Sequence, residues 1–207
     1  YNSGRDEQSL SDEYVAAYGA MPLNWLGYVP VYHEVSRGSL PGHPLAGRYA
    51  GIVTWFQDNL DRNAQPVGAL LQRARDEGVR IAVLGQFGIP PGNKLNATFA
   101  VDSRSVPTPA MVQFGRRDGL GYEFDPIADR RSFFALTTAG ADAPVRLLSD
   151  RGDTMDAIAY TAWGGYALDP YVITELSVAN RARWALEPFE FFRRALDLRP
   201  LPTPDVT

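Results

Sequence analysis

The sequence predicts an α/β fold with a mostly parallel central sheet flanked by helices, and a second half rich in short strands. The first observation is the nearly continuous apolar run at 49–56, YAGIVTWF, which is typical of a strand covered on both faces. The second is the amphipathic segment 66–78, which begins at a proline, ends at a glycine and precedes another apolar run at 79–84. A strand–helix–strand unit of this length predicts two parallel strands joined by a right-handed crossover.

The sequence before this unit predicts a helix that begins near residue 9 or 11, followed by a strand. Ser9 or Ser11 begins the helix, because a short side-chain acceptor is followed by two acidic residues near the positive end of the helix dipole. Beyond Gly27, the β-branched and aromatic stretch 28–35 predicts a strand, and Pro30 indicates an edge position or a bulge.

The chain beyond residue 84 predicts a short helix, a series of short strands and a final helix. The first helix is expected over 93–100, and the last over 188–196, where a proline stands in the first turn. The strand-like stretches between turns are 111–114, 133–137, 145–148, 156–161, 171–173 and 183–186. Residues 1–199 are therefore expected to form a single α/β domain, and the proline-rich residues 200–207 a linker to a following domain.

Composition argues against several classes of function. The formal net charge of −4 lacks the excess of basic residues that nucleic-acid phosphates require. The chain has no cysteine, so thiolate catalysis and cysteine-based metal or iron–sulfur sites are excluded. No apolar run approaches the roughly 20 residues that cross a bilayer. We therefore expect neither a nucleic-acid partner nor insertion into a membrane.

The turn at 85–88 follows a buried strand, where α/β folds place ligand loops. Its glycine spacing suggests a nucleophile elbow, but Gln86 and Phe87 stand where a serine or cysteine would attack. Both histidines, His33 and His43, precede this turn, whereas class I glutamine amidotransferases place the base after the nucleophile. We therefore expect no catalytic residue in this chain, with a cryptic hydrolase or reductase-like enzyme as the alternative.

Neither a metal nor a cofactor is predicted. His33 and His43 lie ten residues apart in different expected elements, unlike two ligands on one helix face. The glycines at 85, 88 and 92 depart from the dinucleotide fingerprint, and Pro90 and Pro91 remove two amides that would hold a phosphate.

Six residues are the candidates for ligand binding, because they lie at or near expected strand ends: Asp58, Asn59, Gln86, Phe87, Trp163 and Tyr166. Exposed aromatic rings could stack on sugar faces or hold a cation. Any pocket is expected at the carboxyl ends of the strands. A deep polar pocket would favour a cryptic enzyme, a shallow aromatic groove would favour glycan binding, and a flat apolar patch would favour protein docking.

Three stretches together resemble the PelA family of bacterial periplasmic proteins, which process the Pel exopolysaccharide: YAGIVTWF at 49–56, AWGGY at 162–166 and RWALEPF at 183–189. The resemblance spans most of the chain, and its last stretch is the most specific. In that family such a region lies between a glycoside hydrolase domain and a polysaccharide deacetylase domain.

The resemblance implies a Rossmann-like module, similar to class I glutamine amidotransferases, that acts in exopolysaccharide biosynthesis for a biofilm matrix. The family's catalytic acids and metal ligands belong to the flanking domains, so none is carried over to this chain. Implied partners are those hydrolase and deacetylase domains, a cationic polysaccharide and proteins of the export complex, and the implied location is the periplasm. The expected role is non-catalytic, either structural or glycan-binding, with protein docking as a further alternative.

Overall fold

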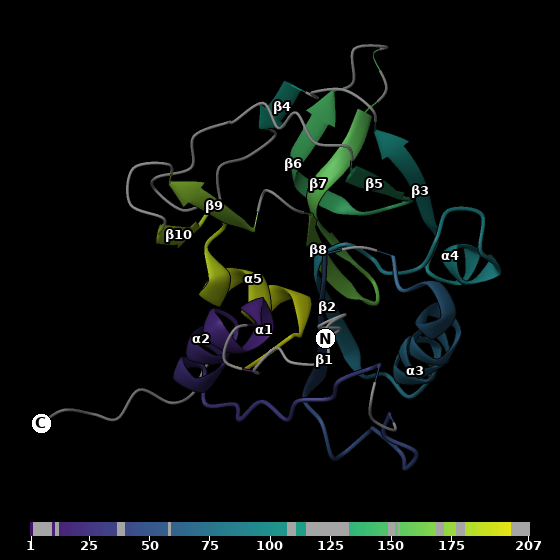
Figure 1. Cartoon of the computed structure of the whole chain (residues 1–207), viewed down its shortest axis with the longest axis vertical. Coiled ribbons are helices and arrows are strands. Elements are labelled where there is room, and N and C mark those ends of the chain that lie inside the picture. The colour runs from purple at the N-terminus through teal and green to yellow at the C-terminus, as the bar shows by residue number, and fades with distance from the viewer. Residues whose placement is uncertain are drawn as a thin grey trace, which may run out of the picture.

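The chain forms a mixed β-sheet with helices on both faces (Figure 1). The computed structural model describes residues 1, 10, 13–36, 40–57, 59–106, 111–114, 133–148, 152, 154–168, 172–176 and 181–199. The helices are α1 (Tyr14–Ala17), α2 (Ala20–Trp25), α3 (Ala64–Asp76), α4 (Lys94–Thr98) and α5 (Pro188–Ala195). The strands are β1 (Gly51–Phe56), β2 (Arg80–Gly85), β3 (Val101–Val106), β4 (Met111–Phe114), β5 (Phe133–Thr138), β6 (Asp142–Leu148), β7 (Thr154–Thr161), β8 (Gly164–Leu168), β9 (Ile173–Leu176) and β10 (Arg181–Trp184).

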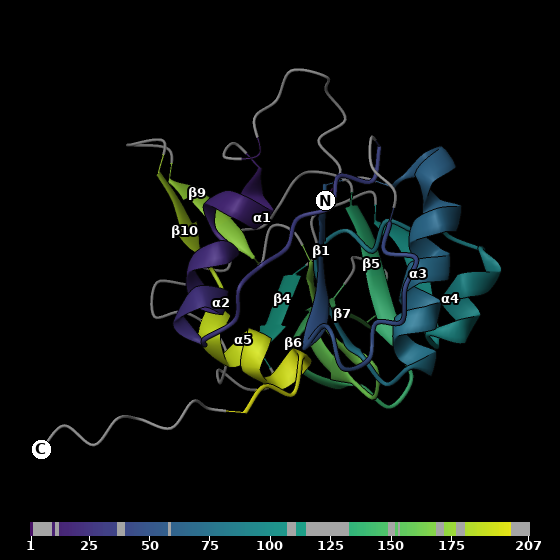
Figure 2. The same ribbon diagram turned by 90° about the horizontal axis from the view of Figure 1, so that it is seen from below.

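The predicted strand–helix–strand unit is confirmed as β1, α3 and β2, with the two strands parallel from Gly51 opposite Arg80 to Phe56 opposite Gly85. Buried residues recur along α3 every three or four positions, which directs one face of the helix onto the sheet: Ala64, Val67, Gly68, Leu71 and Ala74. In Figure 2 this helix and α4 lie on one side of the parallel strands, and α1, α2 and α5 lie on the other. Both faces of β1 and β2 are therefore covered, as their apolar sequences require.

The sheet as a whole is mixed, so the expectation of a mostly parallel, Rossmann-like sheet is not confirmed. Among the described strands, β8 extends the parallel part by pairing with β2, and the remaining pairs of this sheet are antiparallel. The main path runs β1-β2-β8-β7-β5-β3, with β6 pairing β7 and β4. Short turns, not helices, join β5 to β6 and β7 to β8, and a short turn can connect only antiparallel neighbours.

Three elements differ from those expected. The strand predicted over 28–35 is wrong, because the backbone amide of Tyr28 closes α2 by donating to Leu23, and the residues after it join no sheet. The other two differences are the strands β3 and β8, which the sequence did not indicate, although β8 lies in the middle of the sheet. Ser9, Ser11, Tyr171 and the expected linker 200–207 lie outside the described residues.

The last helix confirms the expected start at a proline. Pro188 occupies the first turn of α5, and the Glu187 carboxylate caps it by accepting hydrogen bonds from the backbone amides of Phe189 and Glu190. Phe191 and Phe192 are fully buried, because the helix packs on the face of the sheet opposite α3. This placement brings the first turn of α5 beside α2.

Candidate functional site

The turn after β2 has the backbone of a tight elbow. Gly85 and Gly88 have positive φ values of +78° and +79°. The amide of Gln86 donates to the Phe56 carbonyl over 2.6 Å, and the amide of Leu60 donates to Gly88 over 3.0 Å. These bonds bring the loops after β1 and β2 together, as expected for the carboxyl ends of parallel strands.

The side chain at the elbow lies inside the protein. Gln86 is only 4% exposed, and its Oε1 has no hydrogen-bond partner among the described residues. Asn59, in the neighbouring loop, is half-buried, and Asp58 lies outside the described residues. The elbow therefore presents no reactive side chain to solvent.

The structure brings three of the six candidate residues together, but as part of a buried aromatic cluster. The Phe87 and Trp163 rings have centroids 6.2 Å apart, and Trp163 stacks on Tyr166 at 6.3 Å. The Trp163 indole N–H donates to the Phe99 carbonyl over 3.0 Å. Phe87, Trp163 and Tyr166 are 3%, 7% and 0% exposed, so these rings present almost no face to solvent. A ligand-binding role for them stays a prediction.

Tyr166 ends in a buried polar network. Its hydroxyl donates to the Asp156 carboxylate over 3.2 Å and accepts from the Thr138 hydroxyl over 3.3 Å. Asp156 also accepts from the Thr138 amide and lies 3.6 Å from the Arg146 guanidinium. Burial, together with the nearby Asp156 charge, raises the pKa of Tyr166 well above its ordinary value. These partners satisfy the hydrogen-bonding capacity of the buried Asp156 carboxylate. The network therefore has a structural explanation that involves no ligand.

A cavity of about 410 Å³ lies at the amino ends of β2 and β8, not at the carboxyl ends where a pocket was expected. The residues that line it include Arg75, Arg80, Thr138 and Trp163. The Arg80 guanidinium donates to the carbonyls of Thr161 and Ala162, so it is engaged in holding the turn before β8. With two arginines in its wall, this cavity does not suit a cationic ligand.

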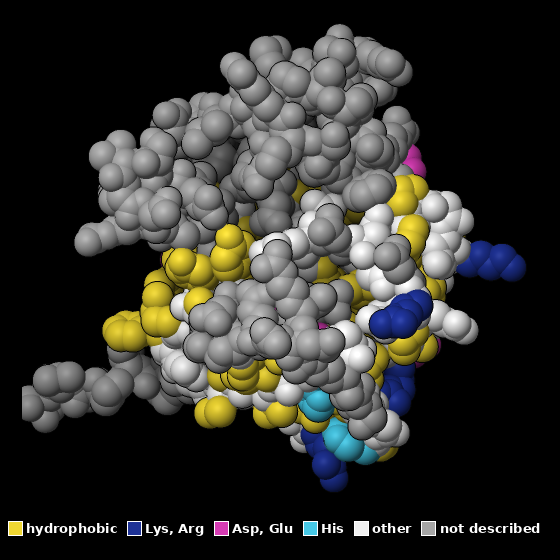
Figure 3. Space-filling view, viewed as in Figure 1, with side chains coloured by type: hydrophobic (Ala, Val, Ile, Leu, Met, Phe, Trp, Pro, Cys, Tyr) yellow, Lys and Arg dark blue, Asp and Glu magenta, His cyan; other side chains and the backbone are white. Residues whose placement is uncertain are grey.

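Among the residues that the structure describes, the large aromatic ring with the most exposure is one that the sequence did not single out. Trp25, at the end of α2, is 76% exposed, and its ring meets Phe189 edge-to-face with centroids 6.2 Å apart. Met21, one helical turn earlier, is 53% exposed, so both side chains lie on the outer face of α2. Figure 3 shows hydrophobic side chains gathered on the side of the molecule where Figure 1 places α2 and α5. We call Trp25 and Phe189 the aromatic pair.

A signal for the exposure of Trp25 was present in the sequence. The buried residues of α2 are Pro22 and Leu23, which define its inward face. Met21 and Trp25 are spaced four residues apart and fall off that face. The short, interrupted helical pattern concealed the spacing.

No group of three histidine, aspartate or glutamate side chains within the described ranges is arranged to hold a metal ion. None of the helices in the described part of the chain has the length and apolar character needed to cross a membrane. Comparison of the chain with protein-family models, with curated proteins and with solved structures finds no significant match.

Proposed function

We propose that this chain is a non-catalytic, glycan-handling module of an exopolysaccharide (Pel) modification protein, which works in the periplasm during biofilm matrix biosynthesis. It would position flanking hydrolase and deacetylase domains and contact the polymer that passes between them. The three stretches that resemble the PelA family support this context, and the parallel β1–α3–β2 unit with β8 supports a Rossmann-like, amidotransferase-like ancestry for the module.

The observation that carries the glycan-handling role is the aromatic pair. A ring that is 76% exposed on a packed helix offers a fixed apolar face, and sugars present apolar C–H faces that stack on such rings. Phe189 holds the Trp25 ring from one side, which reduces the freedom that the ring would lose on binding. The pair is therefore a pre-formed contact for a sugar ring.

The net charge of the chain suits a polymer that carries free amino groups, since the formal net charge is −4. The two carboxylates beside Phe189 are already engaged, because Glu187 caps α5 and Glu190 pairs with Arg193. An ammonium group on a deacetylated sugar could instead lie over the Trp25 face in a cation–π contact. The buried Gln86 elbow supports a non-catalytic role, because its side chain is withdrawn from solvent.

Calorimetric titration with galactosamine oligomers, in about 0.01 M and about 0.15 M salt, tests the proposal. We expect binding that persists at the higher salt concentration and weakens about tenfold in Trp25→Ala, because a stacked ring contributes about 0.5–1.5 kcal/mol. Trp25→Phe, which retains a ring, should bind with intermediate affinity. Trp163→Phe is the control, since Trp163 is buried and its substitution should leave binding unchanged.

The absence of binding at either salt concentration would contradict the glycan-handling role. Protein docking would then be the better account, because Val29 and Val31 follow α2 and are 86% and 64% exposed. Exposed aliphatic side chains of this kind favour contact with a protein over contact with a sugar.

A further inference from the structure

The cavity of about 410 Å³ at the amino ends of β2 and β8 is lined by positive charge, although the chain as a whole is acidic. Among the described residues, Arg75 lines it from the end of α3 and Arg80 from the start of β2, and no aspartate or glutamate lines it. Asp76, the acidic residue next to Arg75, does not belong to this lining. The charge of the cavity therefore favours an anionic ligand.

Arg80 is held beside this cavity by two hydrogen bonds. Its Nη1 donates to the carbonyls of Thr161 and Ala162, which also line the cavity, over 3.4 Å and 2.6 Å. The Nε and Nη2 groups of the same guanidinium have no hydrogen-bond partner within the described part of the chain. That side of a guanidinium carries two parallel N–H donors, which pair with two oxygens of a phosphate or carboxylate group. Because the carbonyls fix the guanidinium, it loses little freedom when it binds an anion.

Arg75 differs from the other arginine in the last turn of α3. Arg73 donates to the Pro41 carbonyl and lies 3.9 Å from the Glu77 carboxylate. Arg75 is exposed, and its side chain forms neither a hydrogen bond nor an ion pair with any residue that the structure describes. An arginine in a last turn also stabilises a helix through its dipole, which requires no ligand. The two roles predict different effects of a substitution, namely a loss of affinity or a loss of stability.

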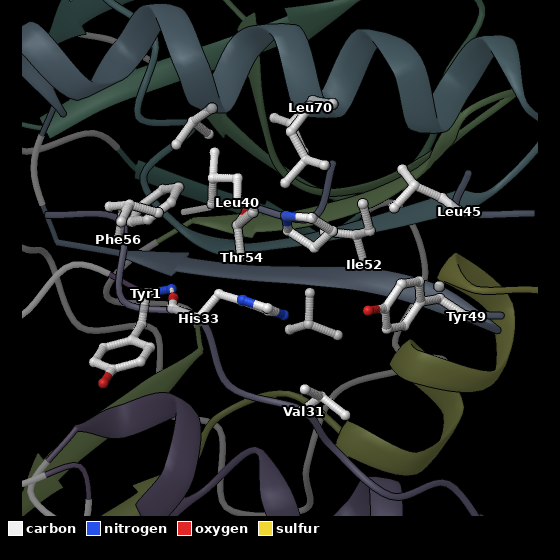
Figure 4. Close-up of a pocket in the computed structure, with 16 residues that line it drawn as sticks. Tyr1, Val31, His33, Leu40, Leu45, Tyr49, Ile52, Thr54, Phe56 and Leu70 are labelled. Carbon is white, nitrogen blue, oxygen red and sulfur yellow. Dashed lines mark hydrogen bonds between the residues drawn. The ribbon is translucent and has the colours of Figure 1, made fainter. Parts of the chain in front are cut away.

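A smaller cavity, of about 110 Å³, lies along β1 (Figure 4). Thr54 and His33 lie on opposite faces of β1 in this view, so one small molecule does not reach both side chains. The N-terminal ammonium of Tyr1 also belongs to its lining, and it already donates to the His33 carbonyl over 3.1 Å. The polar groups described in this wall therefore do not converge on one ligand.

We propose that the cavity of about 410 Å³ binds a small organic phosphate monoester. A phosphate monoester carries close to two negative charges at neutral pH, which two guanidiniums balance. Arg80 pairs side-on with two phosphate oxygens, and Arg75 binds the remaining oxygen from α3. Three exposed alanines of the lining offer small apolar surfaces to the organic part of the ligand: Ala100, Ala139 and Ala162. The volume lies within the range of about 300–1,000 Å³ that is typical of small-molecule sites.

Calorimetric titration of the 207-residue chain with phenyl phosphate, in about 0.15 M salt, tests this proposal. We expect saturable binding that weakens about tenfold or more in Arg75→Gln, because hydrogen bonds between charged groups are the strong ones. Arg62→Gln is the matched control, since it removes the same charge from an exposed arginine that does not line the cavity. Benzoate, which has the ring and a single charge, should bind at least about threefold more weakly than phenyl phosphate. Absence of phenyl phosphate binding, or equal losses of affinity in the two variants, would overturn the proposal.

Two further measurements separate a ligand role from a structural one. If Arg75→Gln lowers the melting temperature and leaves the affinity unchanged, Arg75 serves only the helix dipole and the proposal is wrong. Arg80→Lys retains the charge and loses the paired donors, so phenyl phosphate should bind about tenfold more weakly to the folded variant.

NMR of the indole N–H groups provides the second of these measurements. Phenyl phosphate should shift the signal of Trp163, which lines the cavity, and leave that of the exposed Trp25 in place. An unmoved Trp163 signal would contradict binding in this cavity. Galactosamine oligomers are expected to act on Trp25 instead, so this proposal and the glycan-handling role fail separately.

Discussion

At the scale of single residues, Gly164 shows how a glycine can determine the position of a strand. Its φ of +151° is open to glycine and rarely adopted by other residues. A Cβ at this position would collide with the backbone of Ile81, the neighbour of Gly164 on β2. The glycine at 164 therefore allows β8 to pack closely on β2. Its presence has a structural reason and does not indicate a ligand-binding loop.

We expect Gly164→Ala to lower the free energy of unfolding by about 3 kcal/mol or more, since it combines a strained backbone with a steric collision. Gly140→Ala is the matched control, because Gly140 also has a positive φ, of +74°, but has open space around it. That substitution should cost about 1 kcal/mol. Urea denaturation measures both, and equal losses in the two variants would contradict this account of Gly164.

Tyr166 makes stability depend on pH in the alkaline range. Its pKa is raised by burial and by the Asp156 charge, so the phenol stays protonated in the folded chain at a pH where it ionises in the unfolded chain. Its contribution is therefore fully present below the unfolded pKa, near 10, and is lost as the pH rises above that value.

We expect the free energy of unfolding of the parent chain to fall above pH 10 more steeply than that of Tyr166→Phe, by about 1.4 kcal/mol per pH unit. At neutral pH the same variant should be less stable by about 1 kcal/mol, because the Asp156 carboxylate and the Thr138 hydroxyl lose a partner. Urea denaturation at a series of pH values measures both effects. Parallel pH profiles for the two proteins would refute the assignment.

The sequence indicated which aromatic residues lie near strand ends but not which way their rings point. Trp163 and Tyr166 are both buried, whereas Trp25, at the end of a helix, is exposed. The direction of a ring depends on which strand lies beside it, as β2 lies beside Tyr166. That neighbour is set by the sheet order, which local spacing does not contain. The contact between Trp25 and Phe189 was therefore found only in the structure.

At the scale of elements, the predicted helices and strands were correct where the local pattern of apolar residues was strong. The periodic apolar face of α3 and the apolar runs of β1 and β2 placed all three to within two residues. The pattern failed for β8, because two glycines at its start interrupt the run of β-forming residues. It failed for 28–35, because the β-branched residues there have no strand to pair with. Whether such a segment forms a strand depends on neighbouring strands that are distant in the sequence.

The cap of α5 offers a test at this scale. Glu187→Ala removes the carboxylate that accepts the amides of Phe189 and Glu190, so we expect the free energy of unfolding to fall by about 1 kcal/mol. Glu190→Ala is the control, because it removes an acidic residue of the same turn that pairs with exposed Arg193 and caps nothing. Its cost should be about 0.5 kcal/mol or less. Thermal denaturation that ranks the two variants in the opposite order would show that Glu187 is not the effective cap.

At the scale of the whole molecule, the mixed sheet has a parallel half and an antiparallel half, which differ in how they are covered by helices. The parallel strands β1, β2 and β8 are covered by α3 on one face and by α5 on the other, so this half is buried. In the described segments between the antiparallel strands, no helix intervenes. The parallel half carries the aromatic pair through α2 and α5, as expected for a surface that positions a partner.

The most direct test of the glycan-handling role is NMR of the four tryptophan indole N–H groups during titration with galactosamine oligomers. Trp25 is 76% exposed, whereas Trp55 and Trp163 are 4% and 7% exposed, so the four signals report on surface and core separately. We predict a saturable shift of the Trp25 signal while the Trp55 and Trp163 signals stay in place. An unmoved Trp25 signal, or a shift confined to Trp163, would contradict the proposal that the aromatic pair binds the polymer.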